Sequence, residues 1–268
     1  MKSQHVLRFS AAAFLLLSAS HAMARGEKDF SAESGLHGSL GLGIGVKPEY
    51  SDAKNREVRL QPSVSLFYGD TWFLTGMTAG ANLLRRQTSG GIRITAGPLL
   101  AWRSGRKESD NSALTGLGDI KSGIDAGGFL GLKIGDYQIR TEILKDFTNE
   151  NGGSTVTLSA GRGWNVSERL NVQTSANAVW ASADHMNLFY AISATQAANS
   201  GLAQYQADSG IKSVGVNLMA DYRIDRDWGA FTSGRYSRLV GNAAASPIVS
   251  SLGSRDQVSA TIGVRYRF

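Results

Sequence analysis

The feature that most constrains this chain is an alternation of apolar and polar residues with a period of two, running from residue 36 to the carboxyl terminus. Successive side chains of a β-strand point to opposite faces, so the alternation predicts strands with one apolar and one polar face. The clearest instance closes the chain, where every second residue is apolar: Val258, Ala260, Ile262, Val264, Tyr266 and Phe268.

The same alternation fills most of the chain between residues 36 and 268. It is found in segments 36–46, 56–68, 91–103, 123–134, 137–147, 154–164, 169–182, 211–223 and 228–238. Each segment has roughly the ten residues that a tilted strand needs to cross a bilayer. The segments therefore have the length as well as the pattern of a transmembrane β-barrel.

A soluble β-sandwich also alternates, and the polar positions distinguish the two architectures. The solvent face of a sandwich carries many Lys and Glu residues. Here the polar positions are mostly Gly, Ser, Thr, Asn and Gln with scattered Arg, which is typical of a barrel lumen. Aromatic residues near the strand ends resemble the girdles of membrane barrels: Trp72, Trp102, Tyr137, Trp164, Trp180, Trp228, Tyr266 and Phe268.

The predicted fold is an all-β, antiparallel transmembrane β-barrel of about twelve strands. Segment 71–90 reads as one long strand or as two short strands broken near Gly80, and two give an even count of twelve. Ten strands is the alternative. Because such barrels have short periplasmic turns and longer outer loops, segments 104–122, 183–210 and 239–256 are expected on the outer side.

The first residues predict export. Lys2 and Arg8 precede an apolar run of about eleven residues, and Ala22-Met23-Ala24 fits a cleavage site. The run is too short for a membrane anchor, which needs about 20 residues. The expected organisation is a signal peptide at 1–24, a short periplasmic N-terminal segment at 25–35 and a barrel at 36–268, placed in the outer membrane of a Gram-negative cell.

Composition argues against several classes of function. The chain has no cysteine, and only His37 and His185 remain after cleavage, so no metal, cofactor or catalytic triad is predicted. No Gly-x-Ser-x-Gly motif is present. Cleavage leaves 28 − 2 = 26 basic and 22 acidic residues, a net charge of +4 without any block of like charge. The sequence predicts neither an enzyme nor a nucleic-acid-binding protein.

Several segments resemble the MipA/OmpV family of Gram-negative outer-membrane proteins. The resemblance covers residues 36–268 and is most specific in "RLVGNAAASP". It rests on Gly41, Gly43, Gly45, Pro48, Tyr50, Arg59, Pro62, Gly105, Arg106, Gly116, Leu117, Asp119, Ile120, Gly201, Leu202, Tyr205, Arg238, Leu239, Gly241, Ser246, Pro247, Tyr266 and Phe268. Asn242 stands where the family commonly has an acidic residue.

The resemblance implies a non-enzymatic barrel that acts as a scaffold, joining a murein-degrading lytic transglycosylase to a murein-synthesising penicillin-binding protein. A narrow porin-like channel for small solutes and a surface adhesin are the alternatives. The expected surroundings are outer-membrane lipid and lipopolysaccharide. An aromatic carboxyl terminus, here Tyr266 and Phe268, resembles the signal read by the barrel-assembly machinery, or forms part of an aromatic girdle.

Six charged residues fall on the polar positions of their strands and are predicted to face the lumen. They are Arg59, Arg93, Arg103, Arg140, Glu142 and Arg265. One interpretation is a constriction that attracts anions, since rings of charge set pore selectivity. The favoured interpretation is a network of Arg–carboxylate pairs that fills a narrow barrel. Twelve strands lie between filled eight-stranded barrels and open sixteen-stranded porins, so size does not decide.

Overall fold

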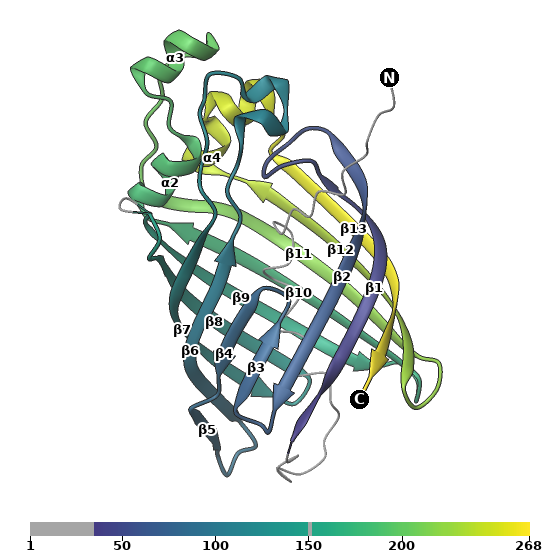
Figure 1. The fold of residues 1–268 in the computed structure, drawn as a ribbon. Coiled ribbons are helices and arrows are strands. Elements are labelled where there is room, and N and C mark those ends of the chain that lie inside the picture. The colour runs from purple at the N-terminus through teal and green to yellow at the C-terminus, as the bar shows by residue number, and fades with distance from the viewer. Residues whose placement is uncertain (1–34, 150–151) are drawn as a thin grey trace, which may run out of the picture.

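The computed structural model describes residues 35–149 and 152–268, so the predicted signal peptide and the segment up to residue 34 lie outside the described residues. The described part forms one antiparallel sheet that closes on itself (Figure 1). Its strands are β1 (Leu36–Pro48), β2 (Arg56–Tyr68), β3 (Trp72–Thr75), β4 (Thr78–Ala81), β5 (Leu84–Gln87), β6 (Arg93–Arg103), β7 (Gly123–Ile134), β8 (Tyr137–Asp146), β9 (Ser154–Asn165), β10 (Leu170–Ala181), β11 (Gly210–Arg223), β12 (Trp228–Leu239) and β13 (Asp256–Arg267).

The barrel has twelve strands, as predicted, and the alternative of ten is wrong. Both β4 and β5 pair with β6, so together they form one strand with an interruption at residues 82–83. Segment 71–90 does contain two antiparallel strands. The turn between them falls at Gly76 and Met77, however, and not near Gly80. Gly80 lies inside β4, where an added Cβ would clash with Phe73 and Leu99.

The carboxyl-terminal strand closes the barrel against the first strand. β13 pairs with β1 in the register Leu40↔Tyr266, and Gly38 and Phe268 exchange two backbone hydrogen bonds of 2.9 and 3.1 Å. The alternation of β13 also separates apolar from polar side chains. Ile262 is 62% exposed on the outer surface, whereas Arg265 is 4% exposed on the opposite face. Closure leaves no unpaired edge between β1 and β13, which a lipid environment requires.

Two prolines lie where the sheet does not need a backbone donor. The hairpin of β3 and β4 is short, so the β2 residues Arg56–Ser63 pair only with β1. Pro62 lies in this part of β2, and Pro98 lies on β6 opposite the interruption between β4 and β5. Because proline has no N–H, it is tolerated in a sheet only at such edges and breaks.

Connections at the two ends differ as predicted, and the longer ones are folded. Short turns join strands at one end, which we call the periplasmic end because barrels of this type have short periplasmic turns. At the other, outer end the connections form helices (Figure 1). These are η1 (Glu108–Asp110), η2 (Ser112–Leu114), α2 (Ala183–Tyr190), α3 (Ala194–Ser200), α4 (Gly241–Ala245) and η3 (Ile248–Leu252). We call segments 49–55, 104–122, 182–209 and 240–255 the cap.

Serine residues start the two helices of the longest connection. The Ser182 hydroxyl accepts from the His185 N–H at the start of α2, and Ser193 forms a capping box with Gln196 at the start of α3. Such caps satisfy backbone donors that a short helix leaves free. Among the described residues, no helix is long and apolar enough to cross a membrane.

Candidate functional site: a charged layer beneath the cap

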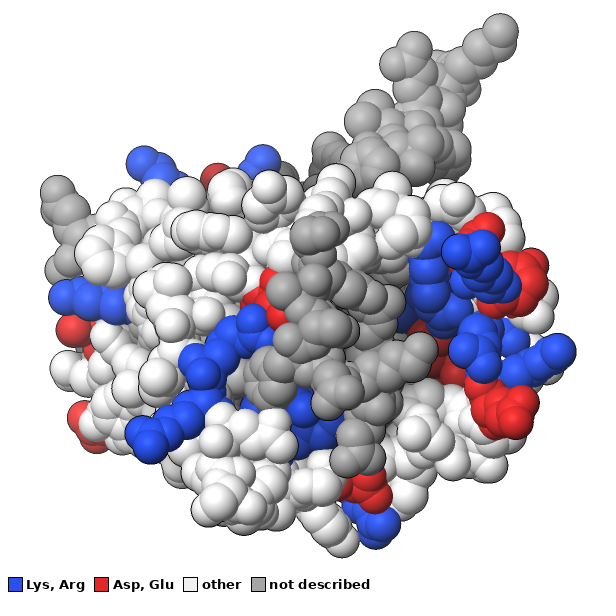
Figure 2. Space-filling view, turned by 90° about the horizontal axis from the view of Figure 1, so that it is seen from below, with Lys and Arg blue, Asp and Glu red and all other residues white. Residues whose placement is uncertain are grey.

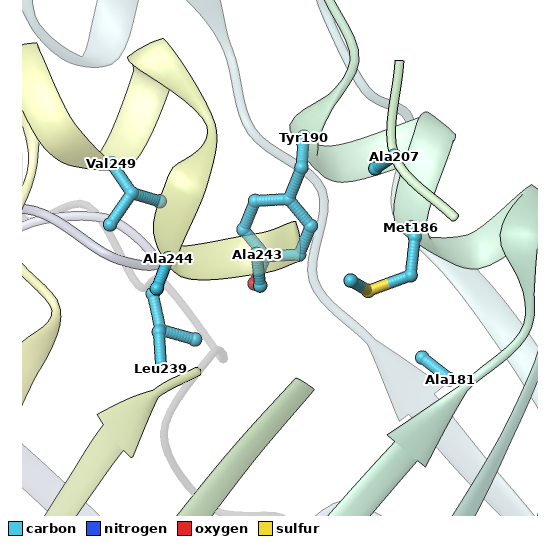
Figure 3. Close-up of a cluster of buried hydrophobic side chains, with 8 residues drawn as sticks. All are labelled: Ala181, Met186, Tyr190, Ala207, Leu239, Ala243, Ala244 and Val249. Carbon is cyan, nitrogen blue, oxygen red and sulfur yellow. The ribbon is translucent and has the colours of Figure 1, made fainter. Parts of the chain in front are cut away.

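The cap contains two hydrophobic cores, one made of cap residues alone and one that also includes the last residues of β10 and β12. One comprises Tyr50, Ala53, Leu114, Leu117, Ile192 and Ile248. The other, shown in Figure 3, comprises Ala181, Met186, Tyr190, Ala207, Leu239, Ala243, Ala244 and Val249. Contiguous buried clusters of this kind stabilise one arrangement of the chain. The outer connections therefore form a packed unit and not a set of independent loops.

Several of the segments that carry the family resemblance come together in this cap, while others lie in the strands. Tyr50, Leu117 and Leu239 contribute to its cores although they are far apart in sequence. Ser246 is fully buried, and its hydroxyl donates to the Tyr190 carbonyl at 2.7 Å. The Tyr205 hydroxyl donates to the Asn242 carbonyl at 2.8 Å. This part of the resemblance thus follows the contacts that assemble the cap.

Beneath the cap, Asp52 is the centre of a group of charged side chains. It is the one non-glycine residue of the described chain with a positive φ, 71°. The residue as a whole is partly exposed, while its carboxyl group is enclosed and accepts a hydrogen bond from the Tyr190 hydroxyl. Burial raises the pKa of Asp52, although Lys212, Tyr190 and Arg106 favour its charged form. Burial and the neighbouring Asp52 raise the pKa of Tyr190 well above its ordinary value.

Arg103, one of the predicted lumen charges, joins three strands at the outer end. Asp125 on β7 and Asp146 on β8 lie directly opposite each other in the sheet. Two carboxylates so placed repel each other. The Arg103 Nε lies 3.1 Å from Asp125 Oδ1, and its Nη2 donates to Asp146 Oδ2. Arg103 is 6% exposed, so this is a buried ion-pair cluster.

A β-bulge brings Lys212 into the same layer. Val179 pairs with Ser213 and Trp180 pairs with Ile211, so Lys212 is the extra residue of β11. Bulges of this kind redirect a side chain. The Lys212 Nζ lies 3.3 Å from His185 Nε2, and Lys212 also interacts electrostatically with Asp52, Asp125 and Arg103. Lys212 thus lies between Asp52 of the cap and the Asp125–Arg103–Asp146 cluster of the wall.

His185 is a buried residue, although it lies in segment 183–210, which the sequence predicts as an outer loop. It is 6% exposed, and its ring lies 4.9 Å from that of Phe189. Burial, together with Lys212 and Arg103, lowers the pKa of His185 well below its usual value near 6.5. The neutral ring accepts a hydrogen bond from Lys212, which an imidazolium cannot do. No cluster of three potential metal ligands occurs among the described residues.

Acidification is expected to loosen the cap through His185. The lowered pKa means that the unfolded state binds a proton more readily, so the stabilisation is complete above about pH 6.5 and is lost as pH falls below it. The slope reaches at most about 1.4 kcal/mol per pH unit. Hydrogen exchange of α2 at pH 7.5 and pH 5 measures this effect. In His185→Gln the exchange of α2 should no longer depend on pH. In His37→Gln, which changes a histidine at the other end of the barrel, it should depend on pH as in the wild type. An equal pH dependence in both variants would contradict the assignment of the effect to His185.

The six predicted lumen charges do not form one ring. Arg103 lies at the outer end and Arg265 near the periplasmic end of the barrel, and Arg93 begins β6 at that same end. Five of them take part in ion pairs that the structure shows. Arg59 pairs with Glu57 at 2.5 Å and Arg103 with Asp125 and Asp146 as above, while Arg140 pairs with Glu142 at 2.7 Å and Arg265 with Asp221 at 2.9 Å.

The two terminal aromatic residues lie at the periplasmic end on the outer surface. Tyr266 is 40% exposed and Phe268 46% exposed. The Tyr266 ring lies 5.3 Å from the ring of Trp228 and 6.4 Å from that of Phe268. This arrangement is typical of an interfacial aromatic girdle.

Sequence reasoning missed five residues of the charged layer at the outer end. They are Asp52, Asp125, Asp146, Tyr190 and Lys212, and their positions depend on partners from distant segments.

Comparison with known proteins gives relatives for both sequence and fold. The family model described as "MltA-interacting protein MipA" matches residues 40–268. Proteins named MltA-interacting protein from Escherichia coli (strain K12) and Shigella flexneri are each 27% identical over 213 residues, which is 79% of this chain and 83% of theirs.

Among solved structures, the COG4313 outer membrane channel from Pseudomonas putida F1 is 11% identical with a TM-score of 0.43, covering 91% of this chain and 100% of its own. The translocator domain of autotransporter NalP from Neisseria meningitidis is 10% identical with a TM-score of 0.43, covering 93% and 92%. The family match extends over most of the chain and confirms the resemblance found in its motifs. The chain therefore belongs to the MipA family and is an outer-membrane β-barrel protein.

Proposed function

We propose that this protein is a non-enzymatic scaffold of the outer membrane that brings a lytic transglycosylase and a penicillin-binding protein together at the murein layer. The observation that carries the proposal is membership of the MipA family, whose two relatives above are named for an interaction with MltA. Family membership fixes the fold more firmly than the activity, so the partners need a direct test.

The periplasmic end is the proposed docking face, because murein enzymes work in the periplasm. Figure 2 views the molecule from below, where basic and acidic side chains lie around this end. The exposed charges of the turns and strand ends are Arg85, Arg86, Asp136, Glu168, Arg169, Arg223, Asp225, Arg226 and Asp227. Mixed charges favour specific recognition of a partner surface over general attraction of a polyanion.

The turns that carry these charges are held by local hydrogen bonds. The Asp225 carboxylate accepts from the Asp227 and Trp228 N–H groups at 2.9 and 2.8 Å, and these bonds lower its pKa. The Ser167 hydroxyl accepts from the Leu170 N–H at 3.1 Å. A surface that is already ordered loses less conformational entropy when a partner binds. This order supports docking by the turns themselves.

Site-specific photo-crosslinking in intact membranes tests the scaffold. A crosslinker placed at Arg226 is expected to capture a murein hydrolase or synthase, identified by mass spectrometry. A crosslinker at Thr115, on the exposed cap, is the matched control and should capture neither. Capture of no murein enzyme from Arg226, or equal capture from both positions, overturns the proposal.

A narrow channel for small solutes is the second candidate. A twelve-stranded wall with inward polar side chains supports it, because barrels of this size are wider than filled eight-stranded ones. Recordings on the purified mature protein in planar bilayers test this candidate. Stable conductance steps would support a channel, and their absence from folded protein would dismiss it.

We also propose that Tyr266 and Phe268 are read by the barrel-assembly machinery, and that the exposed apolar band contacts outer-membrane lipid and lipopolysaccharide. Phe268→Ala is expected to lower the amount of folded protein in the outer membrane several-fold, because slow assembly exposes the chain to proteolysis. Quantitative blotting of outer-membrane fractions measures it. Trp228→Ala, which removes another girdle aromatic, is the control, and an equal loss in that variant would show that general girdle packing is responsible.

A further inference from the structure

The guanidinium of Arg265 has one edge that no described residue uses. Arg265 is 4% exposed on the lumen side of β13, and its Nη1 lies 2.9 Å from Asp221 Oδ2. Its Nε and Nη2 atoms are both buried and have no hydrogen-bond partner within residues 35–149 and 152–268. Leaving buried donors of a charged group unsatisfied is unfavourable. This unpaired edge is therefore a place where an acceptor is expected.

The two unpaired donors have a geometry that selects a class of ligand. Nε–H and one N–H of a terminal nitrogen point in parallel from the same side of the guanidinium plane. This fork matches the two oxygen atoms of a carboxylate or a phosphate, which it binds through two parallel hydrogen bonds. A single water oxygen accepts from both donors only through bent and therefore weaker hydrogen bonds.

Local charge also favours an anion at this place. The carboxylate of Asp221 is shared, because its Oδ1 accepts from Arg267 while its Oδ2 faces Arg265. Two guanidinium groups thus share one carboxylate, which leaves a net charge of 2 − 1 = +1. A further anion would complete the balance.

The barrel wall holds the Arg265 side chain in position. Its guanidinium carbon lies 4.5 Å from the centroid of the Phe231 ring. That ring in turn lies against Gly41, Gly43 and Gly263, where added Cβ atoms would lie 3.4, 3.3 and 2.8 Å from its edge. The absence of side chains at these glycines lets the ring lie against the wall. A guanidinium supported in this way is oriented before any ligand arrives.

Arg103 and Arg140 differ from Arg265 in this respect. The Nε of Arg103 faces Asp125 and its Nη2 faces Asp146, so carboxylates of the protein already occupy the corresponding edge. The Nε of Arg140 lies 2.7 Å from Glu142, and its guanidinium stacks 3.8 Å from the Phe129 ring. Arg140 is therefore a matched control, because it is also inward, paired and stacked on a phenylalanine.

We propose that the Nε/Nη2 edge of Arg265 binds the carboxylate or phosphate group of a small solute near the periplasmic end of the lumen. The site is distinct from the scaffold surface on the periplasmic turns, and its ligand needs no murein enzyme.

Titration of the folded mature protein in detergent with inorganic phosphate or acetate tests the proposal, with chloride at the same ionic strength as reference. The Nε–H resonance of Arg265, assigned by its loss in Arg265→Lys, should shift saturably with phosphate or acetate and not with chloride. The anion whose titration saturates at the lower concentration is the one that the site prefers, phosphate or carboxylate. Absence of a saturable shift with both anions overturns the proposal.

Variants provide a second measurement. Phosphate or acetate should raise the thermal unfolding midpoint of the wild-type protein and of Arg140→Gln. In Arg265→Gln the apparent affinity should fall by at least about tenfold, because the charge and the fork are both removed. Arg265→Lys keeps the charge but lacks the two parallel donors, and it replaces Arg265→Gln in this measurement if the glutamine variant does not fold. An unchanged affinity in the variant that folds also overturns the site, and neither result bears on partner capture by the turns.

Discussion

Arg103→Met is expected to destabilise the mature protein by about 3–5 kcal/mol, the largest effect predicted for a single substitution. Arg103 is the cation between Asp125 and Asp146, which face each other across β7 and β8 and are themselves almost inaccessible to solvent. Without it, two carboxylates remain buried without their common cation. Urea unfolding of the protein refolded in lipid or detergent, followed by tryptophan fluorescence, measures the change.

Two controls separate loss of the buried charge from loss of any arginine. Arg238 pairs with Asp256 at 2.9 Å, but both side chains are almost half exposed. Arg238→Met should therefore have little effect, because solvent screens an exposed pair. Adding Asp125→Asn and Asp146→Asn to Arg103→Met should recover most of the stability. A triple variant as unstable as the single one would mean that packing, and not charge, is responsible.

Leu117→Ala is expected to unfold the cap locally while the barrel stays closed. Leu117 is 2% exposed in the core that also contains Leu114, Ile192 and Ile248. Truncation of a fully buried leucine costs about 2–5 kcal/mol. The loss falls on the cap because Leu117 makes no pair in the strand ladder. Hydrogen exchange of α3 should accelerate, and the strand amides should remain protected.

The controls for this prediction lie on the surface of the cap and of the wall. Ser250→Ala changes an exposed residue of η3, and Leu60→Ala changes an exposed residue of β2. Neither should alter the exchange of α3. Simultaneous loss of protection in the cap and in the strands of Leu117→Ala would show that the two units unfold together, although the core of Leu117 consists of cap residues alone.

The sequence by itself determined the architecture of the wall. A period of two requires strands whose faces differ, and an apolar outer face with a polar inner face requires closure in lipid. The same alternation placed Arg103, Arg140 and Arg265 on the inner face. These inferences use side-chain direction alone, which in a strand depends only on the parity of the position.

Only the tertiary structure decided what the inward and outer residues contact. Asp146 is far from Arg103 in sequence, and strand register brings the two together. Asp52 is likewise far from Arg106, and the folding of two distant connections brings them near each other. Lys212 enters the layer through a bulge, which breaks the parity on which sequence reasoning depends. The unpaired edge of Arg265 was equally hidden, because Asp221 and Phe231, which contact its guanidinium, lie on other strands. Local pattern fixes the direction of a side chain, whereas its partner is fixed by contacts between segments far apart in the chain.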